Sequence, residues 1–316
     1  MFNVQCSMFN YFRTFVAVMK KGLVLEGGGL RALFSAGVTD VMMENNIQFD
    51  GLIGVSAGAT FGCNYKSGQI GRALRYNIAF KDDPRYMSWR SFWKTGDLVG
   101  AEFSYHVLPT ELDIFDNEAF RQNPMEFHIV CTDAETGEPV YKQLDTMDSE
   151  GLDWIRASAS MPIVSRPVPL EGRKLLDGGI VNSIPLKHFQ ELGYERNIVV
   201  LTQPKGFFKK RTKLMPLFHL TMRKYPAIIK AMGRRHLMYN EQLCYLAEQE
   251  AKGNVLLIYP EDTLPIGRTE LNEEKMRYVY QLGRKCAEDN LKRIKEFLTK
   301  TDKTLACAAC STSNNL

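Results

Sequence analysis

The chain has 316 residues, of which 45% are hydrophobic and 24% are charged, and its formal net charge at pH 7 is +4. This length allows one large domain or two smaller ones, and the hydrophobic fraction excludes a wholly disordered chain. No run of 18 or more apolar residues occurs, so the sequence predicts no transmembrane helix.

Residues 1–20 are interpreted as an N-terminal extension. They are moderately apolar but interrupted by polar residues, and they show neither a basic leader nor a clear cleavage site for a signal peptidase. We therefore expect this segment to precede the folded core rather than to direct secretion.

A first strand is predicted at Gly22–Glu26, and it ends in the glycines Gly27, Gly28 and Gly29. Three consecutive glycines leave backbone N–H groups unshielded at the start of the next helix, where anions bind. In acyl transfer such donors stabilise the developing oxyanion, and losing one donor typically costs about 3–4 kcal/mol. Arg31 follows in the first helical turn, where it could steady the loop or meet an anionic group.

The same loop has a second interpretation. Gly27, Gly29 and Ala32 fit the dinucleotide fingerprint G-x-G-x-x-G/A, which also follows a strand and begins a helix. That fingerprint needs an acidic residue near the far end of the second strand, whereas Asp50 stands at its beginning. A nucleotide-binding oxidoreductase therefore remains as an alternative function.

Gly54-Val55-Ser56-Ala57-Gly58 is a G-x-S-x-G pentapeptide. It follows a short predicted strand, Gly51–Ile53, and precedes small and apolar residues that can begin a helix. A strand, a sharp turn and a helix in this order present the serine hydroxyl at the top of the sheet. We expect Gly54 and Gly58 to be glycines because side chains there would collide with the neighbouring strand and helix. Ser56 is thus a candidate nucleophile.

Short apolar strands alternate with helical stretches along the chain, which predicts an α/β fold with a mostly parallel central sheet covered by helices on both faces. The stretch 135–139 contains Gly137 between two strands and predicts a hairpin, so the sheet is expected to be mixed at one place. The remaining predicted strands are Phe127–Cys131, Val140–Gln143, Lys174–Leu176, Ile198–Thr202 and Val255–Tyr259.

Asp177 ends one of these strands and is followed by Gly178 and Gly179. This setting holds a carboxylate at a tight turn, although an ordinary Asp-Gly turn without a catalytic role has the same sequence pattern. Upstream, the segment 157–162 is rich in small residues and ends in Pro162. Such a segment could pack tightly beneath a site.

In chain order, the stretches 27–31, 54–58, 157–162 and 177–179 resemble the patatin-like phospholipase family, and the resemblance covers roughly residues 20–205. The match is best to the bacterial branch with a C-terminal helical region, although Ala32 stands where the family's glycine motif often ends in glycine. The resemblance implies a three-layer α/β sandwich and a catalytic domain at 21–205.

The resemblance also implies a site. Ser56 and Asp177 would form a catalytic dyad, and the loop formed by the three glycines and Arg31 would be the oxyanion hole. Neither a metal ion nor a cofactor is expected, because backbone donors replace a metal as the electrophile.

A dyad requires Asp177 to act as a base, although an aspartate with the usual pKa near 3.9 is a poor base for a serine hydroxyl. Burial beside Ser56 should raise that pKa and improve the match. His188, a short distance along the chain from Asp177, is the alternative base. The other histidines are His106, His128, His219 and His236.

The region 206–304 is predicted to be basic and mainly helical. Between Arg196 and Asn240 the sequence has eleven Lys and Arg residues and no Asp or Glu, with aromatic residues interleaved. A surface of this kind suits peripheral contact with an anionic membrane, and no nucleic-acid module is recognisable. Residues 270–300 show helical periodicity, and these helices could pack on the core or cover the entrance for an acyl chain.

Seven cysteines, an odd number scattered along the chain, favour a reducing compartment. Cys307 and Cys310 form a C-x-x-C pair in the small, polar tail at 305–316, which is predicted to be flexible and not to bind zinc. A cytoplasmic location is expected, peripheral at most to the inner face of the membrane.

The predicted function is a serine hydrolase of lipid acyl esters: a phospholipase A, a lysophospholipase or an esterase acting on phospholipids or other acyl esters. Besides the oxidoreductase, a non-catalytic membrane-associated protein with the same fold is the second alternative.

Overall fold

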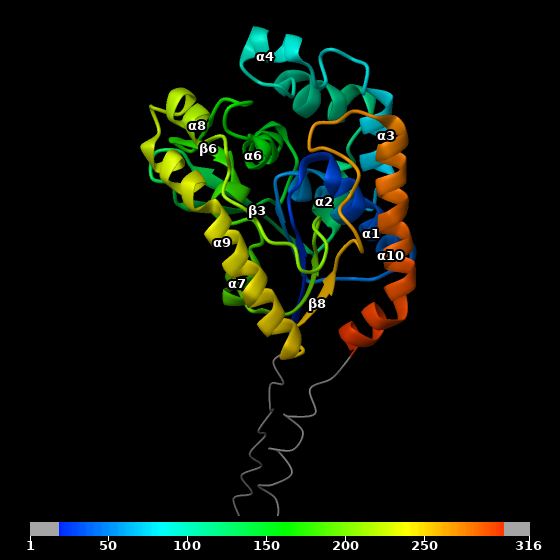
Figure 1. Ribbon diagram of the computed structural model, residues 1–316. Coiled ribbons are helices and arrows are strands. Elements are labelled where there is room, and N and C mark those ends of the chain that lie inside the picture. Colours follow the sequence, from blue (N-terminus) through cyan, green and yellow to red (C-terminus); the bar gives the residue numbers. More distant parts are fainter. Residues whose placement is uncertain (1–18, 300–316) are drawn as a thin grey trace, which may run out of the picture.

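The structure is a computed structural model, and it describes residues 19–299. Residues 1–18 of the extension predicted at 1–20, and the predicted tail at 305–316 with Cys307 and Cys310, lie outside the described residues. The last residue of the predicted extension, Lys20, begins the first strand of the sheet. A central sheet stands between two layers of helices, as the sequence predicted (Figure 1).

The described strands form one eight-stranded sheet in the order β5-β6-β3-β2-β1-β7-β8, with β4 paired to β3 off this path. Strands β1, β2, β3, β7 and β8 pair in parallel, whereas β4, β5 and β6 join through antiparallel pairs. The strands are β1 Lys20–Leu25, β2 Gly51–Val55, β3 Glu126–Asp133, β4 Pro139–Gln143, β5 Val168–Leu170, β6 Arg173–Asp177, β7 Tyr194–Val200 and β8 Val255–Ile258.

All seven predicted strands are present, and the hairpin predicted at 135–139 joins β3 to β4, with Gly137 at a φ of 74°. Strand β5 was not predicted. It has only three residues, too few for an apolar or alternating pattern to show.

Helices cover both faces of the sheet (Figure 1). The helices are α1 Leu33–Glu44, α2 Ala57–Lys66, α3 Arg72–Ala79, α4 Trp89–Thr95, α5 Asn117–Gln122, α6 Ser149–Ala159, α7 Leu186–Glu191, α8 Met215–Thr221, α9 Pro226–Ala251 and α10 Glu273–Thr299. Three further helical segments are described: the 3-10 helices η1 Gly29–Ala32 and η3 Gly178–Ile180, and the π-helix η2 Phe103–Leu112.

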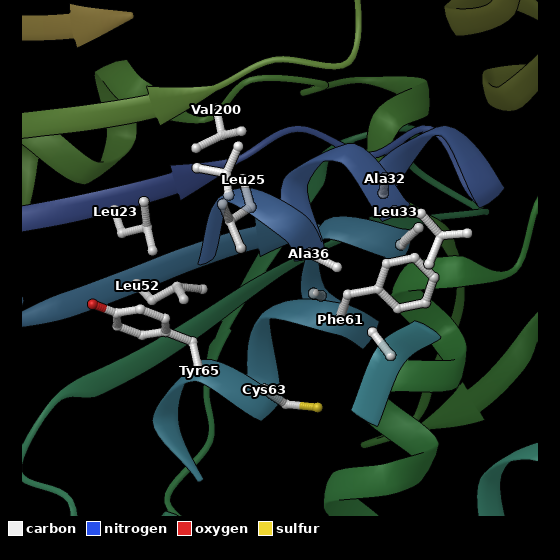
Figure 2. Packing of buried hydrophobic residues seen from close by; sticks show 14 of the residues in the cluster. Leu23, Leu25, Ala32, Leu33, Ala36, Leu52, Phe61, Cys63, Tyr65 and Val200 are labelled. Carbon is white, nitrogen blue, oxygen red and sulfur yellow. The ribbon is translucent and has the colours of Figure 1, made fainter. Parts of the chain in front are cut away.

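The strands at the centre of the sheet are apolar on both sides. Successive side chains of a strand point to opposite faces. Leu23 and Leu25 of β1 therefore pack with α1 and α2, as Figure 2 shows, whereas Val24 packs with residues of α7 and α9. This burial on both faces explains why residues 23–25 of β1 are all apolar instead of alternating with polar residues.

The C-terminal region is built into the same body as the preceding residues. Strand β8 extends the sheet by pairing in parallel with β7, from Asn197 opposite Val255 to Val200 opposite Ile258. Helix α10 lies along α1, where the Tyr280 hydroxyl donates a 2.6 Å hydrogen bond to the Asp40 carboxylate. No helix within residues 19–299 is long and apolar enough to cross a bilayer.

Candidate active site

Ser56 occupies the sharp turn between β2 and α2. Its backbone has φ 56° and ψ −126°, a conformation that residues with a side chain rarely adopt. The first turn of α2 holds it there, because the N–H groups of Ala59 and Thr60 both donate to the Ser56 carbonyl, at 2.9 and 3.0 Å.

The two glycines of the pentapeptide are needed for close packing. A side-chain carbon at Gly54 would lie 2.6 Å from the Ala59 Cα in α2, and one at Gly58 would lie 2.5 Å from the Leu25 carbonyl oxygen in β1. These contacts are with the neighbouring helix and strand, which is the steric role that the sequence predicted for both residues.

Strand β3 brings Ser56 and Asp177 to the same level of the sheet. Val130 pairs with Val55, the residue before Ser56, and the next residue, Cys131, pairs with Asp177. The Ser56 side chain lies close enough to the Asp177 carboxylate to stabilise its charged form, which lowers the pKa of Asp177. Two residues 121 positions apart in the chain therefore meet because their strands pair with consecutive residues of one partner strand.

Ser158 on α6 supports this turn from beneath. Its side chain is completely buried, and its Oγ accepts a 3.0 Å hydrogen bond from the Ser56 N–H and donates one of 2.7 Å to the Val130 carbonyl. The nearby Ser160 carbonyl accepts a 2.8 Å bond from the Asp177 N–H. The small-residue segment thus packs beneath the site as expected, but the hydrogen bonds of Ser158 were not predicted.

The environment of Asp177 makes its carboxyl group a weaker acid than an aspartate in water. Burial raises the pKa of its carboxyl group, and this effect outweighs the effects of the Ser56 side chain, the hydrogen bond from the Gly179 N–H and the charges of Arg235 and Arg268, which lower it. The Gly179 N–H donates at 2.7 Å, within the short turn that Gly178 and Gly179 form after β6. A carboxylate with a raised pKa is a stronger base than one in water.

The glycine loop lies directly beside Ser56. A side-chain carbon at Gly27 would come within 2.8 Å of the Ser56 Cβ. Within residues 19–299, the N–H groups of Gly28 and Gly29 have no acceptor, whereas the next N–H, of Leu30, donates to the Arg268 carbonyl at 2.9 Å. Both free donors belong to residues that line the same cavity as Ser56.

Arg31 braces this loop. Its Nε donates a 3.3 Å hydrogen bond to the Gly28 carbonyl. Its guanidinium also reaches the side-chain oxygen of Gln203, at 3.3 Å in the amide orientation that satisfies both residues. Of the two roles that the sequence left open for Arg31, these contacts favour steadying the loop.

Glu26, the residue that follows β1, was not predicted to have a role. It is almost fully buried, and its carboxylate accepts hydrogen bonds from the Thr202 N–H at 2.7 Å and from the Tyr239 hydroxyl at 2.7 Å. Thr202 follows β7 and Tyr239 lies on α9, so Glu26 connects the start of the glycine loop to the C-terminal helices.

Two cavities meet at Ser56. The smaller, about 130 Å³, is lined mainly by apolar residues, among them Phe61, Tyr76, Leu108, Phe115 and Ile155. The larger, about 640 Å³, is lined by the glycine loop, Asp177 and several basic residues: Arg31, Lys209, Lys210, Arg235 and Arg268. A substrate held at Ser56 could place chemically different parts on either side of the hydroxyl.

The alternative base, His188, lies elsewhere. Its ring stacks on Tyr141 with centroids 3.4 Å apart, and it lines neither of the cavities that contain Ser56. Of the five histidines, His236 does line the larger cavity, and its Nδ1 has no hydrogen-bond partner within residues 19–299.

The dinucleotide interpretation lacks its acidic residue in the described structure. The Asp50 carboxylate accepts a 2.7 Å hydrogen bond from the Lys21 N–H, at the opposite end of β1 and β2 from the glycine loop and Ser56. Among residues 19–299, no three His, Cys, Asp or Glu side chains gather in a way that could hold a metal ion.

Two family models match the chain. The patatin-like phospholipase model matches residues 23–189, and a domain of unknown function, DUF6363, matches residues 225–299. The chain therefore belongs to the patatin-like phospholipase family, as the four sequence stretches predicted.

Similar proteins include an uncharacterized protein of Escherichia coli K12, YjjU, which is 26% identical over 292 residues, 88% of this chain and 79% of that protein. The lysophospholipase nte1 of Aspergillus oryzae is 28% identical over 179 residues, 54% of this chain but 11% of that protein. An uncharacterized NTE family protein of Mycobacterium tuberculosis H37Rv is 27% identical over 178 residues, 56% of this chain and 48% of that protein. The chain thus spans only part of the latter two relatives.

Among solved structures, VipD from Legionella pneumophila is 12% identical, with a TM-score of 0.43 over 87% of this chain and 67% of that one. At this level the likeness adds nothing to the family assignment.

Proposed function

We propose that this protein is a serine hydrolase of lipid acyl esters in which Ser56 is the nucleophile and Asp177 the general base. The observation that carries the proposal is the position of Ser56 beside the buried Asp177 carboxylate, in one cavity and on strands that pair with consecutive residues of β3. The free N–H groups of Gly28 and Gly29 beside it, and membership of the patatin-like phospholipase family, support the same conclusion.

The reaction would proceed through an acyl-enzyme. Ser56 Oγ attacks the ester carbonyl carbon while its proton passes to Asp177, and the carbonyl oxygen becomes an anion held by the Gly28 and Gly29 N–H groups. The bond to the leaving alcohol then breaks, and Asp177 returns the proton to that oxygen. Asp177 next takes a proton from water, whose oxygen attacks the acyl carbon. Ser56 leaves with the proton, and the free fatty acid is released.

The apolar cavity is the proposed site for the acyl chain. Residues such as Phe61 and Leu108 remove its methylene groups from water, which is worth about 0.8 kcal/mol for each buried CH₂. Lipid esters are therefore preferred over short-chain esters. Phospholipase A, lysophospholipase and general esterase activity all fit this chemistry, and the lysophospholipase from Aspergillus oryzae supports the second of these.

Contact with a membrane is also proposed. Large apolar side chains are exposed at one end of the molecule, with Trp93 of α4 82% exposed and Leu220 of α8 70% exposed. Figure 1 shows α4 and α8 at the same end of the molecule, and the larger cavity is lined by Trp89 of α4 and Leu217 of α8. Aromatic and basic residues around an active-site entrance suit an anionic membrane surface.

Flotation with vesicles tests this contact. Binding is expected to vesicles with anionic lipid and to weaken in a Trp93→Ala variant. Equal binding to neutral and anionic vesicles, or none to either, contradicts the proposed contact.

A fluorophosphonate probe tests the chemistry. It should label the wild type and a Ser104→Ala variant, because Ser104 lines the apolar cavity without a role in the reaction. Labelling should be lost in Ser56→Ala and strongly slowed in Asp177→Asn. p-Nitrophenyl esters of increasing chain length should be hydrolysed with rising kcat/KM by the wild type. Failure to release p-nitrophenol from any ester, with Ser56 unlabelled, would favour the non-catalytic membrane-associated protein.

A further inference from the structure

The larger cavity beside Ser56 carries an excess of positive charge. Five basic side chains line it, against the two carboxylates of Glu26 and Asp177. Both carboxylates already accept hydrogen bonds from neutral donors, Glu26 from Thr202 and Tyr239 and Asp177 from the Gly179 N–H. The cations are therefore not explained as partners of these acids.

Four of the cations come from the C-terminal part of the chain: Lys209, the exposed Lys210, Arg235 and Arg268. Within residues 19–299 none of them forms an ion pair. The Lys209 ammonium lies over the Tyr239 ring, 4.0 Å from its centroid, and Arg235 donates to the Gly179 carbonyl and to Ser183 Oγ. The Arg268 side chain has no hydrogen-bond partner in this part of the chain, although its backbone carbonyl anchors Leu30 at the glycine loop.

These like charges act on one another. Burial, followed by the charges of Arg235 and Arg268, lowers the pKa of Lys209 to about 7, with a smaller contribution from Arg31. Burial and the charge of Arg268 also lower the pKa of Arg235. Cations held together with fewer counter-charges than positive charges repel one another, and an anion bound among them relieves the repulsion.

We propose that Lys209, Arg235 and Arg268 form an anion subsite that receives a phosphate group on the alcohol side of the substrate. Ser56 and Arg268 each line both cavities, so an ester with its carbonyl at Ser56 and its acyl chain among the apolar residues extends its alcohol portion towards these cations. Two guanidinium groups and an ammonium match a phosphate in charge and in donor geometry.

This inference rests on the proposed function and specifies its substrate class as acyl esters of phosphorylated alcohols. It also gives a role to the C-terminal region. Arg235 and Arg268 both lie in the segment 225–299 matched by the domain of unknown function. That segment would then complete the active site and set its selectivity.

Two water-soluble substrates test the subsite without a membrane: 1-octanoyl-glycerol 3-phosphate and 1-octanoylglycerol, both as monomers. The readout is the ratio of their kcat/KM values. The wild type should prefer the phosphorylated ester, and Arg268→Gln should lower the ratio about tenfold, as expected for losing one hydrogen bond to a charged group. Arg234→Gln is the matched control, because it removes the same charge from an exposed residue of α9 that does not line the cavity, and its ratio should equal the wild-type value.

The outcomes separate the two proposals. Hydrolysis of neither ester by the wild type overturns the proposed function. Hydrolysis of both esters with no preference, or a ratio in Arg268→Gln equal to that of Arg234→Gln, overturns only the subsite. If inorganic phosphate slows both reactions while the wild type shows no preference, the cavity binds free phosphate rather than a headgroup, and the substrate inference is wrong.

Discussion

Replacing Ser158 by alanine removes the hydroxyl that supports the turn at Ser56. In the wild type this group accepts from the Ser56 N–H at 3.0 Å and donates to the Val130 carbonyl at 2.7 Å, in a completely buried position. Leaving a buried donor unsatisfied costs about 1–3 kcal/mol, and each lost hydrogen bond contributes about 1 kcal/mol. We expect Ser158→Ala to lower the free energy of unfolding by about 2–4 kcal/mol.

The same change should slow catalysis. Ser56 is held at its positive φ partly by this N–H bond, and misplacing a reacting group by about 1 Å can cost a factor of about 100 in rate. We expect labelling of Ser56 by a fluorophosphonate to slow at least tenfold, at a temperature where the variant remains folded.

Urea denaturation followed by tryptophan fluorescence measures the stability, and the labelling rate measures the alignment of Ser56. Ser160→Ala is the matched control, because within residues 19–299 the Ser160 hydroxyl donates only to the Arg156 carbonyl one helical turn earlier, at 2.8 Å. Its cost should stay below about 1 kcal/mol. If the two variants have the same stability and the same labelling rate, the supporting role of Ser158 is refuted.

Three further predictions concern pH and packing. Because burial raises the pKa of Asp177, the acid limb of the pH profile of kcat/KM should lie above the usual aspartate range near pH 4, and a limb at or below it contradicts the role of burial. Gly58→Ala, with its new carbon 2.5 Å from the Leu25 carbonyl, should destabilise by about 3 kcal/mol or more, and an unchanged melting temperature contradicts this. Burial raises the pKa of Asp40 to about 6 from 3.8, so its ionisation penalises the folded state as pH rises through this window. Asp40→Asn can still accept the hydrogen bond from Tyr280, so it should stabilise the folded state at pH 7 by at most about 3 kcal/mol, at 1.36 kcal/mol per unit of pKa shift. Below pH 4 it should have no stabilising effect. Thermal melts that show equal effects at pH 7 and below pH 4 contradict this prediction.

Features that depend on local pattern could be predicted from the sequence. The strand and the glycines around Ser56, and the turn after Asp177, each form within a few residues. Short apolar runs and glycine pairs therefore predict them without knowledge of the rest of the chain.

Features that depend on residues far away in the chain could not be predicted from the sequence. Ser158 acts through the Ser56 N–H, 102 residues away, and Glu26 acts through Tyr239, 213 residues away. Serine and glutamate at such positions look ordinary in sequence, because their importance lies in burial and in the partner that folding supplies. Arg268 likewise stands in a loop with no motif around it, and only the fold brings it to the cavity.

The attachment of β8 to β7 has a consequence for dissecting the protein. A fragment ending near residue 205 would contain Ser56 and Asp177, yet it would present the backbone of β7 as an uncovered parallel edge and strip α10 from the apolar side of α1. Bare edges of this kind promote intermolecular strand pairing. Such a fragment would aggregate, and its inactivity would say nothing about the chemistry of the intact chain.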